Sequence, residues 1–263
     1  MNGVVYKSTG SWYTVKATDG VFYECKIKGK FRIEGIKSTN PIAAGDHVVF
    51  EVETKGDETI GIINKIASRD NYIIRKSVNL SKQTHIIAAN VDVAFLLVTL
   101  NNPPTFTPFI DRFLVTTEAY HIKAVLLFNK IDAYNEDETL EIKYLAALYR
   151  SIGYECIGIS AKTGKNIDKV KQMMQGNVSM FSGHSGVGKS TLVNTLEPTL
   201  ELKTKQISTQ HMQGQHTTTF AEMYDLSFGA QIIDTPGIKG FGVVEVEKQE
   251  LGNYFPEFFE LKD

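Results

Sequence analysis

The clearest chemistry in the sequence lies at Gly183 to Ser190, which fits the phosphate-binding pattern G-x-x-x-x-G-K-[ST]. An apolar, strand-like segment at Val178–Ser182 precedes it, and a helix is expected directly after it. Glycines let successive N–H groups turn towards a phosphate, and the helix N-terminus adds partial positive charge. Lys189 is expected to reach the outer phosphates of a nucleotide and Ser190 to ligate Mg²⁺. The candidate phosphate contacts are Gly183, His184, Ser185, Gly186, Val187, Gly188, Lys189, Ser190 and Thr191.

A second motif, Asn129-Lys-Ile-Asp132, follows the apolar run Ala124–Phe128. At the end of a strand, the Asp132 carboxylate can accept hydrogen bonds from N1–H and the exocyclic amine of guanine. Adenine presents an acceptor at N1, so the same carboxylate would repel it. Asn129 is expected at the other edge of the base, with the stem of Lys130 over the ring. Taken alone, such an aspartate is more often a helix cap.

A third motif, Ser160-Ala161-Lys162, ends the strand-like segment Tyr154–Ile159. A loop of this kind supplies a backbone N–H to the guanine carbonyl oxygen. Each of the two base motifs is weak alone. Both follow predicted strands, and together they indicate a guanine nucleotide.

The remaining nucleotide contacts are expected towards the end of the chain. Asp234-Thr-Pro-Gly237 follows a predicted strand, so Asp234 would hold Mg²⁺ through a water and the Gly237 N–H would meet the γ-phosphate. A threonine of Gly214–Thr219 would complete the Mg²⁺ shell; Thr217, Thr218 and Thr219 compete, and Thr218 is favoured. The alternative for these threonines is the start of an edge strand, in a hairpin that turns at Ser227–Gly229.

The base motifs precede the phosphate loop, which reverses the order of an ordinary GTP-binding domain. In a doubly wound sheet the ligand lies at the carboxyl ends of parallel strands, so a circular permutation leaves the site intact. The expected join is a helix at Asn166–Gln175 that leads into the strand at Val178. The sequence therefore predicts a circularly permuted P-loop GTPase domain, mostly parallel sheet flanked by helices. A further helix is expected over Asp137–Ile152, with a core-facing stripe of Leu140, Tyr144, Leu145, Leu148 and Ile152.

Residues 1–67 show short alternating apolar runs separated by turn residues, which is typical of a small antiparallel barrel of the OB type. Residues 1–76 carry 12 Lys and Arg against 9 Asp and Glu, which favours a polyanionic partner. Basic residues around Phe31 could track an RNA backbone, or could be an ordinary solvated hairpin: Lys26, Lys28, Lys30 and Arg32. Of the neighbours Trp12 and Tyr13, one is expected in the core and the other at the surface.

Composition sets the remaining bounds. The chain has 263 residues with 42% hydrophobic and 22% charged residues, typical of a globular protein of one or two domains. No apolar run is long enough to cross a bilayer, so no membrane partner is expected. Cys25 and Cys156 are far apart, show no metal-ligand spacing, and are expected to be buried thiols in a reducing compartment.

These motifs and their permuted order resemble the family of small ribosomal subunit biogenesis GTPases, RsgA. The resemblance covers essentially the whole chain and also rests on Ala88–Asp92 and Ile110–Leu114. It implies a cytoplasmic bacterial GTPase, expected as a monomer, that binds the maturing 30S subunit and its 16S rRNA and leaves on hydrolysis. The expected organisation is an α/β protein with an OB-fold at 1–67, a basic connector at 68–89, the GTPase domain at 90–244, and 245–263 as the start of a truncated C-terminal domain.

Two departures from common patterns affect the expected mechanism. Ile238 occupies the position where many GTPases carry a catalytic glutamine, so His216 or a group of the partner is expected to orient the attacking water. Family members resembling this chain continue beyond Phe255–Phe258 into a zinc domain, whose Cys and His ligands are absent here. The alternatives are a GTP-dependent switch with negligible turnover on a non-ribosomal target, and an RNA-binding module with a vestigial nucleotide site.

Overall fold

The computed structural model describes residues 1–27, 41–56, 58–76, 84–200, 221–234 and 254–255. The chain forms two compact units. The first unit spans Met1–Val91, and the second begins at Asp92. A hairpin late in the chain is divided between them: its strands belong mostly to the first unit, and its turn, Leu226–Gln231, belongs to the second. No helix in these described ranges is long and apolar enough to cross a membrane.

The first unit contains a closed five-stranded barrel. Its strands are β1 (Asn2–Ser8), β2 (Tyr13–Ala17), β3 (Phe22–Ile27), β4 (His47–Lys55) and β5 (Glu58–Ile66). Antiparallel pairing joins β1 to β2, β2 to β3, β4 to β5 and β1 to β4, and β3 pairs with β5 in parallel, so the barrel has no open edge. Alternate side chains such as Val5, Val15 and Phe50 fill the interior. The predicted OB-type barrel is confirmed.

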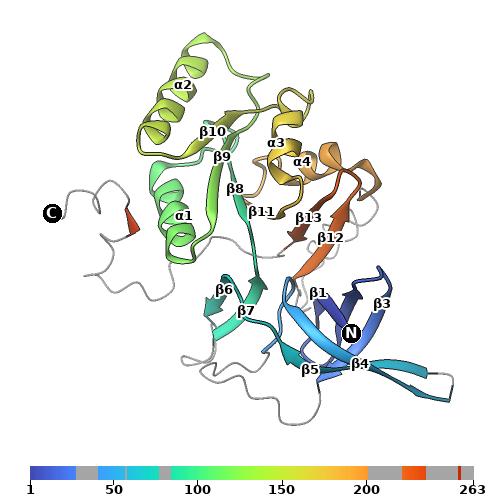
Figure 1. Cartoon of the computed structure of the whole chain (residues 1–263). Coiled ribbons are helices and arrows are strands. Elements are labelled where there is room, and N and C mark those ends of the chain that lie inside the picture. Colours follow the sequence, from blue (N-terminus) through green and yellow to red (C-terminus); the bar gives the residue numbers. More distant parts are fainter. Residues whose placement is uncertain (28–40, 57, 77–83, 201–220, 235–253, 256–263) are drawn as a thin grey trace. The chain divides into compact units, whose positions relative to one another are not determined.

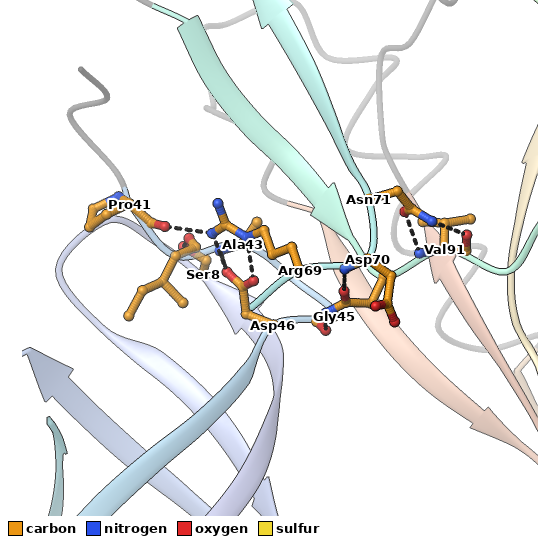
Figure 2. Close-up of polar contacts among 11 residues, drawn as sticks. Ser8, Pro41, Ala43, Gly45, Asp46, Arg69, Asp70, Asn71 and Val91 are labelled. Carbon is orange, nitrogen blue, oxygen red and sulfur yellow. Dashed lines mark hydrogen bonds and ion pairs between the residues drawn. The ribbon is translucent and has the colours of Figure 1, made fainter. Parts of the chain in front are cut away.

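The segment after the barrel is tied to it by buried polar contacts, shown in Figure 2. The Arg69 guanidinium donates to both carboxylate oxygens of Asp46 at 2.6 Å and to the Pro41 carbonyl at 2.7 Å. Asp46 is fully buried, so this ion pair is desolvated and removal of either partner would leave an uncompensated charge. Further along, Asn71 exchanges two hydrogen bonds with the backbone of Val91, at 2.9 Å each. Arg69 therefore has a structural role here.

The predicted basic connector contains a hairpin that the sequence did not indicate. Strands β6 (Tyr72–Lys76) and β7 (Thr84–Ala89) pair antiparallel as a separate two-stranded sheet. Residues 77–83 of the predicted connector lie outside the described residues.

The core of the second unit is a parallel sheet. Strands β8 (Val93–Val98), β9 (Lys123–Phe128), β10 (Glu155–Gly158) and β11 (Val178–Ser182) pair in the order β10-β9-β8-β11. Every residue of β8 is buried, as expected for a strand covered on both faces. Helices α1 (Thr107–Ala119) and α2 (Glu136–Ser151) lie on one side, and α3 (Ile167–Met174) and α4 (Lys189–Leu196) on the other (Figure 1). This is the predicted mostly parallel sheet flanked by helices.

The predicted β-hairpin late in the chain is present. It consists of β12 (Glu222–Leu226) and β13 (Ala230–Asp234), which are neighbours in the sheet. Its turn is closed by the Gly229 N–H, which donates to the Leu226 carbonyl at 3.1 Å. Both cysteines are free and buried, as predicted.

The predicted core stripe of α2 is wrong for three of its five residues, while Leu145 and Ile152 are half-buried. Leu140, Tyr144 and Leu148 are 69%, 72% and 45% exposed, whereas Ile142, Ala146 and Tyr149 face the protein interior. Both rows recur at helical spacing, so periodicity alone did not identify the one that faces the sheet. The helix begins with the capping box of Asn135 and Glu138.

Candidate active site

The predicted base and phosphate motifs meet at one edge of the parallel sheet, because parallel strands have their carboxyl ends on the same side. Each motif directly follows its strand: Asn129 follows β9, Ser160 lies just beyond β10, and Gly183 follows β11. The loop after β8 joins them, since the Leu100 N–H donates to the Tyr134 hydroxyl at 3.0 Å. The same hydroxyl donates to the Asn129 carbonyl at 3.0 Å.

Two glycines shape the phosphate loop. Gly183 has φ of +142°, and a Cβ there would lie 2.9 Å from the Leu97 carbonyl oxygen. Gly188 has φ of +102°, and a Cβ there would collide with the amide nitrogen of Asn129. The glycines therefore permit a backbone path that other residues would strain or block. Gly188 is also the N-cap of α4, whose positive end faces the loop.

The ammonium group of Lys189 lies inside this loop. It donates to the carbonyl of Gly183 at 2.5 Å and to that of His184 at 2.8 Å. Two carbonyl groups of the loop thus hold the positive charge. An anionic phosphate oxygen can replace them as the partner of the ammonium group. Ser190 is exposed in the first turn of α4, and Thr191 beside it is also exposed. The cradle fits a phosphate group.

Asn129 connects the two loops behind this cradle. Its amide nitrogen donates to the Val187 carbonyl at 2.8 Å, and its amide oxygen accepts from the Ala161 N–H at 3.0 Å. The side chain is only 2% exposed, so both contacts are shielded from water. The Thr195 hydroxyl of α4 adds a bond to the Ala161 carbonyl at 2.8 Å. Asn129 therefore sets the spacing between the phosphate loop and the Ser160–Lys162 loop.

Asp132 is exposed and oriented by its neighbour. The buried Ser160 hydroxyl donates to its carboxylate at 2.5 Å and accepts from the Thr163 N–H at 3.1 Å. The Ser160 hydrogen bond lowers the pKa of Asp132, and the positive charge of Lys162 adds to this effect. At neutral pH this side chain is an ionised acceptor, which is the form that two adjacent N–H donors require.

Comparison with known proteins identifies the fold and the chemistry. Residues 66–244 match the family model described as RsgA GTPase, and residues 2–63 match that of the RsgA N-terminal domain. The chain belongs to the RsgA GTPase family. It is therefore a GTP-hydrolysing enzyme, which confirms the resemblance found in the sequence.

Relatives of known name match over the whole chain. A protein of Christiangramia forsetii named small ribosomal subunit biogenesis GTPase RsgA is 72% identical, with 100% of this chain and 83% of the relative covered. One of the same name from Flavobacterium psychrophilum is 65% identical, with 100% and 81% covered.

Two solved structures share the fold. The crystal structure of YjeQ from Thermotoga maritima matches with a TM-score of 0.76 and 32% identity, over 98% of this chain and 82% of that one. The structure of YloQ, described as a circularly permuted GTPase, matches with a TM-score of 0.71 and 26% identity, over 98% and 79%. The predicted permutation is confirmed.

The RsgA fold also gives two predicted site residues, Lys130 and His184, partners that the sequence did not single out. Lys130 donates to the Gly186 carbonyl at 2.9 Å and to the carbonyl of Asn102, so its stem crosses from the base loop to the phosphate loop. His184, a candidate phosphate contact, is half-buried with its ring centre 4.0 Å from that of Phe109 in α1. Asn102 contributes its backbone carbonyl and Phe109 its ring. Neither kind of contact requires a recognisable sequence motif.

Several predicted site residues lie outside the described residues: His216, Thr217, Thr218, Thr219 and Gly237. Asp234 is described as the last residue of β13 and is half-buried. Among the residues that the structure does describe, no group of three or more His, Cys, Asp or Glu side chains could hold a metal ion.

Ser160→Ala is expected to weaken GDP binding about tenfold at neutral pH, because it removes a hydrogen bond to a charged group. It also raises the pKa of Asp132 towards its ordinary value. Guanine reading requires the ionised carboxylate, so binding is lost as the pH falls through that pKa, and the loss begins at higher pH in the variant. Fluorescent GDP titrated from about pH 3 to 7 measures both effects, because the carboxylate of the variant is protonated near its ordinary pKa of 3.8. An unchanged pH profile would show that Ser160 does not tune Asp132; Ser151→Ala, on α2, is the control.

Proposed function

We propose that this protein hydrolyses GTP in the second unit while the barrel of the first unit binds RNA, and that it assists maturation of the small ribosomal subunit. The nucleotide assignment depends on the two hydrogen bonds of the Asn129 side chain, one to Val187 and one to Ala161. These bonds link the phosphate loop to a base loop. The subunit is proposed from the names of the relatives. Hydrolysis would be stimulated by the subunit and would drive release from it.

In this proposal the base is read by Asp132, with Lys130 over the ring. The Lys162 N–H would meet the guanine carbonyl oxygen, since the N–H groups of Ser160 and Ala161 donate within the protein. The phosphates lie in the cradle of Gly183–Thr191, with Lys189 at the outer oxygens. Mg²⁺ would neutralise charge on the β- and γ-phosphates. Its proposed ligands are Ser190, Thr218 and, through water, Asp234, all of which offer the oxygen donors that this ion prefers.

The RNA-binding face that we propose is the outer surface of β2 and β3. Strand alternation puts Tyr13 inside the barrel at 1% exposure and leaves Trp12 at 36%. Lys26 Nζ lies 4.0 Å from the centre of the Trp12 ring. At the other end of the strand pair Lys16 is paired with Phe22, which is 51% exposed. Exposed rings beside ammonium groups suit stacked bases and their phosphates. The other basic residues suggested earlier, Lys28, Lys30 and Arg32 with Phe31, lie outside the described residues.

Trp12→Ala is expected to weaken binding of 16S rRNA fragments about tenfold, since stacking on an aromatic ring contributes roughly 1–3 kcal/mol per base. Val49→Ala, at an exposed position of β4 outside this face, is the matched control. Trp12 is the single tryptophan, so quenching of its fluorescence reports the contact directly in the unmodified protein. RNA binding without quenching and without loss in the variant would place the RNA elsewhere.

His216→Ala is expected to reduce the GTP hydrolysis rate about 100-fold while GTP affinity stays unchanged, because general-base or water-orienting groups act on the transition state. Single-turnover phosphate release and equilibrium binding measure the two quantities. Equal losses in rate and affinity would assign His216 to nucleotide binding.

The experiment that tests the proposed function is phosphate release measured with and without purified small ribosomal subunits. The proposal predicts slow intrinsic turnover and a rate that rises at least about tenfold with subunits, as water-positioning and charge-stabilising groups supplied by a partner can raise rates far more. A rate that is negligible in both conditions would favour a binding switch instead. Large ribosomal subunits at equal concentration are the control.

A further inference from the structure

A cavity of about 880 Å³ opens between α2, β10 and α3 in the second unit. Its walls combine apolar and basic side chains. Ile142 and Ala146 of α2 meet Ile157 of β10 and Met173 of α3 to form the apolar part. Neither the nucleotide cradle nor the barrel accounts for this cavity.

The rim of the cavity is strongly basic. Four exposed cations line it: Lys143, Arg150, Lys165 and Lys169. Among the described lining residues, Glu155 is the one carboxylate, and Lys123 lies 3.5 Å from it. The rim therefore attracts a ligand with several negative charges.

Contacts along β10 disfavour binding of a partner as an added strand at the edge of the sheet. β10 is the edge strand of the parallel sheet, and such strands often accept an added strand. Here the Cys156 carbonyl accepts from the Arg150 guanidinium at 2.6 Å, and the Gly158 carbonyl accepts from the Asn166 amide at 2.7 Å. An added strand would have to displace these two contacts, so recognition by side chains in the cavity is favoured.

We infer that this cavity binds an acidic, apolar peptide segment of a partner protein. The basic rim fits its carboxylates, and the apolar wall fits one or two aliphatic side chains. The α2 wall extends from Thr139 to Arg150, about 16 Å of helix, which matches roughly five residues of extended peptide. A single-stranded RNA fits less well, because it needs exposed rings on which its bases can stack. Of the two aromatic lining residues, Phe128 is buried and the Tyr134 hydroxyl is held by two hydrogen bonds.

Residues next to the proposed base-reading loops also line the cavity. Its lining includes Phe128, which directly precedes Asn129, and Ile131, which lies within the Asn129–Asp132 loop. The Lys165 carbonyl accepts from the Ser160 N–H at 3.1 Å. A bound peptide would order both loops, so GDP release is expected to slow about fivefold, a typical coupling between two sites. This consequence rests on the proposed nucleotide function; the peptide-binding site itself does not.

The test uses an array of heptapeptides built from Glu, Asp, Leu and Phe, with Lys-containing counterparts, probed with the full chain. Acidic peptides are expected to bind, and Lys143→Glu/Lys169→Glu is expected to weaken the best of them at least about tenfold, as loss of close charge pairs does. Lys65→Glu/Arg112→Glu, with the same change of charge at exposed positions outside the cavity, is expected to leave binding unchanged. Retained GDP affinity in both double variants shows that they fold.

Amide chemical shifts then locate the best peptide, and they are expected to change in α2, β10 and α3. Four results would overturn the inference: no acidic peptide binds, binding survives the charge reversal, RNA hexanucleotides bind these residues more tightly, or the shifts map to the outer row Leu140, Tyr144 and Leu148. Peptide binding without any change in GDP release would refute only the coupling. Loss of GDP binding by the unmodified protein would refute the proposed function and leave the peptide result standing.

Discussion

Lys189→Ala is expected to weaken binding of GTP about 1000-fold, or roughly 4 kcal/mol, because it removes the cation from the phosphate cradle. In the structure this ammonium group bonds to two carbonyls of the loop, so it already occupies the position that the outer phosphates would share. Truncation leaves those carbonyls facing a highly charged anion. Equilibrium binding of a fluorescent GTP analogue measures the effect.

Lys123→Ala is the matched control, since Lys123 is an exposed lysine at the start of β9, at the opposite end of that strand from the Asn129 loop. It is expected to bind GTP as the unmodified protein does. A Lys189→Ala variant that keeps its affinity to within about threefold, or less than 1 kcal/mol, would mean that the phosphates lie elsewhere.

Asp132→Asn is expected to exchange base specificity. GTP affinity should fall about 1000-fold, because two hydrogen bonds to a charged acceptor, roughly 1.5–3 kcal/mol each, are lost or weakened. Xanthosine triphosphate has a carbonyl where guanine has its exocyclic amine. The new amide can donate to that carbonyl, so this nucleotide should bind the variant more tightly than GTP. Competition between the two nucleotides measures the exchange.

Asp168→Asn provides the control for Asp132→Asn, because it makes the same chemical change at an exposed position in α3. Equal loss of affinity for both nucleotides in Asp132→Asn would indicate local unfolding of the loop. A variant that still prefers GTP would show that Asp132 does not contact the base.

The loops of the site were predictable because their chemistry is local. The phosphate loop is made of eight consecutive residues, among them Gly188 and Lys189, so its whole pattern is visible in the sequence. The barrel was predictable for a similar reason, since inward and outward residues alternate along each strand, as the buried Tyr13 and Val15 do with the less buried Thr14 between them.

Long-range choices were not predictable in the same way. Helix α2 has two apolar rows, and only the packing of Ile142 and Ala146 on the sheet decides between them. The Asn129 bridge joins residues 58 and 32 positions apart in the chain, so no spacing in the sequence indicates it. The stacking of Phe109 on His184 depends equally on how α1 packs.

The most direct test of the central claim is a crystal structure of this chain with Mg²⁺ and a nonhydrolysable GTP analogue. We expect one nucleotide, with the Asp132 carboxylate within hydrogen-bonding distance of the guanine N1–H and Lys189 Nζ within the same distance of a terminal phosphate oxygen. A nucleotide bound away from either side chain would show that the base and phosphate loops do not form one nucleotide site.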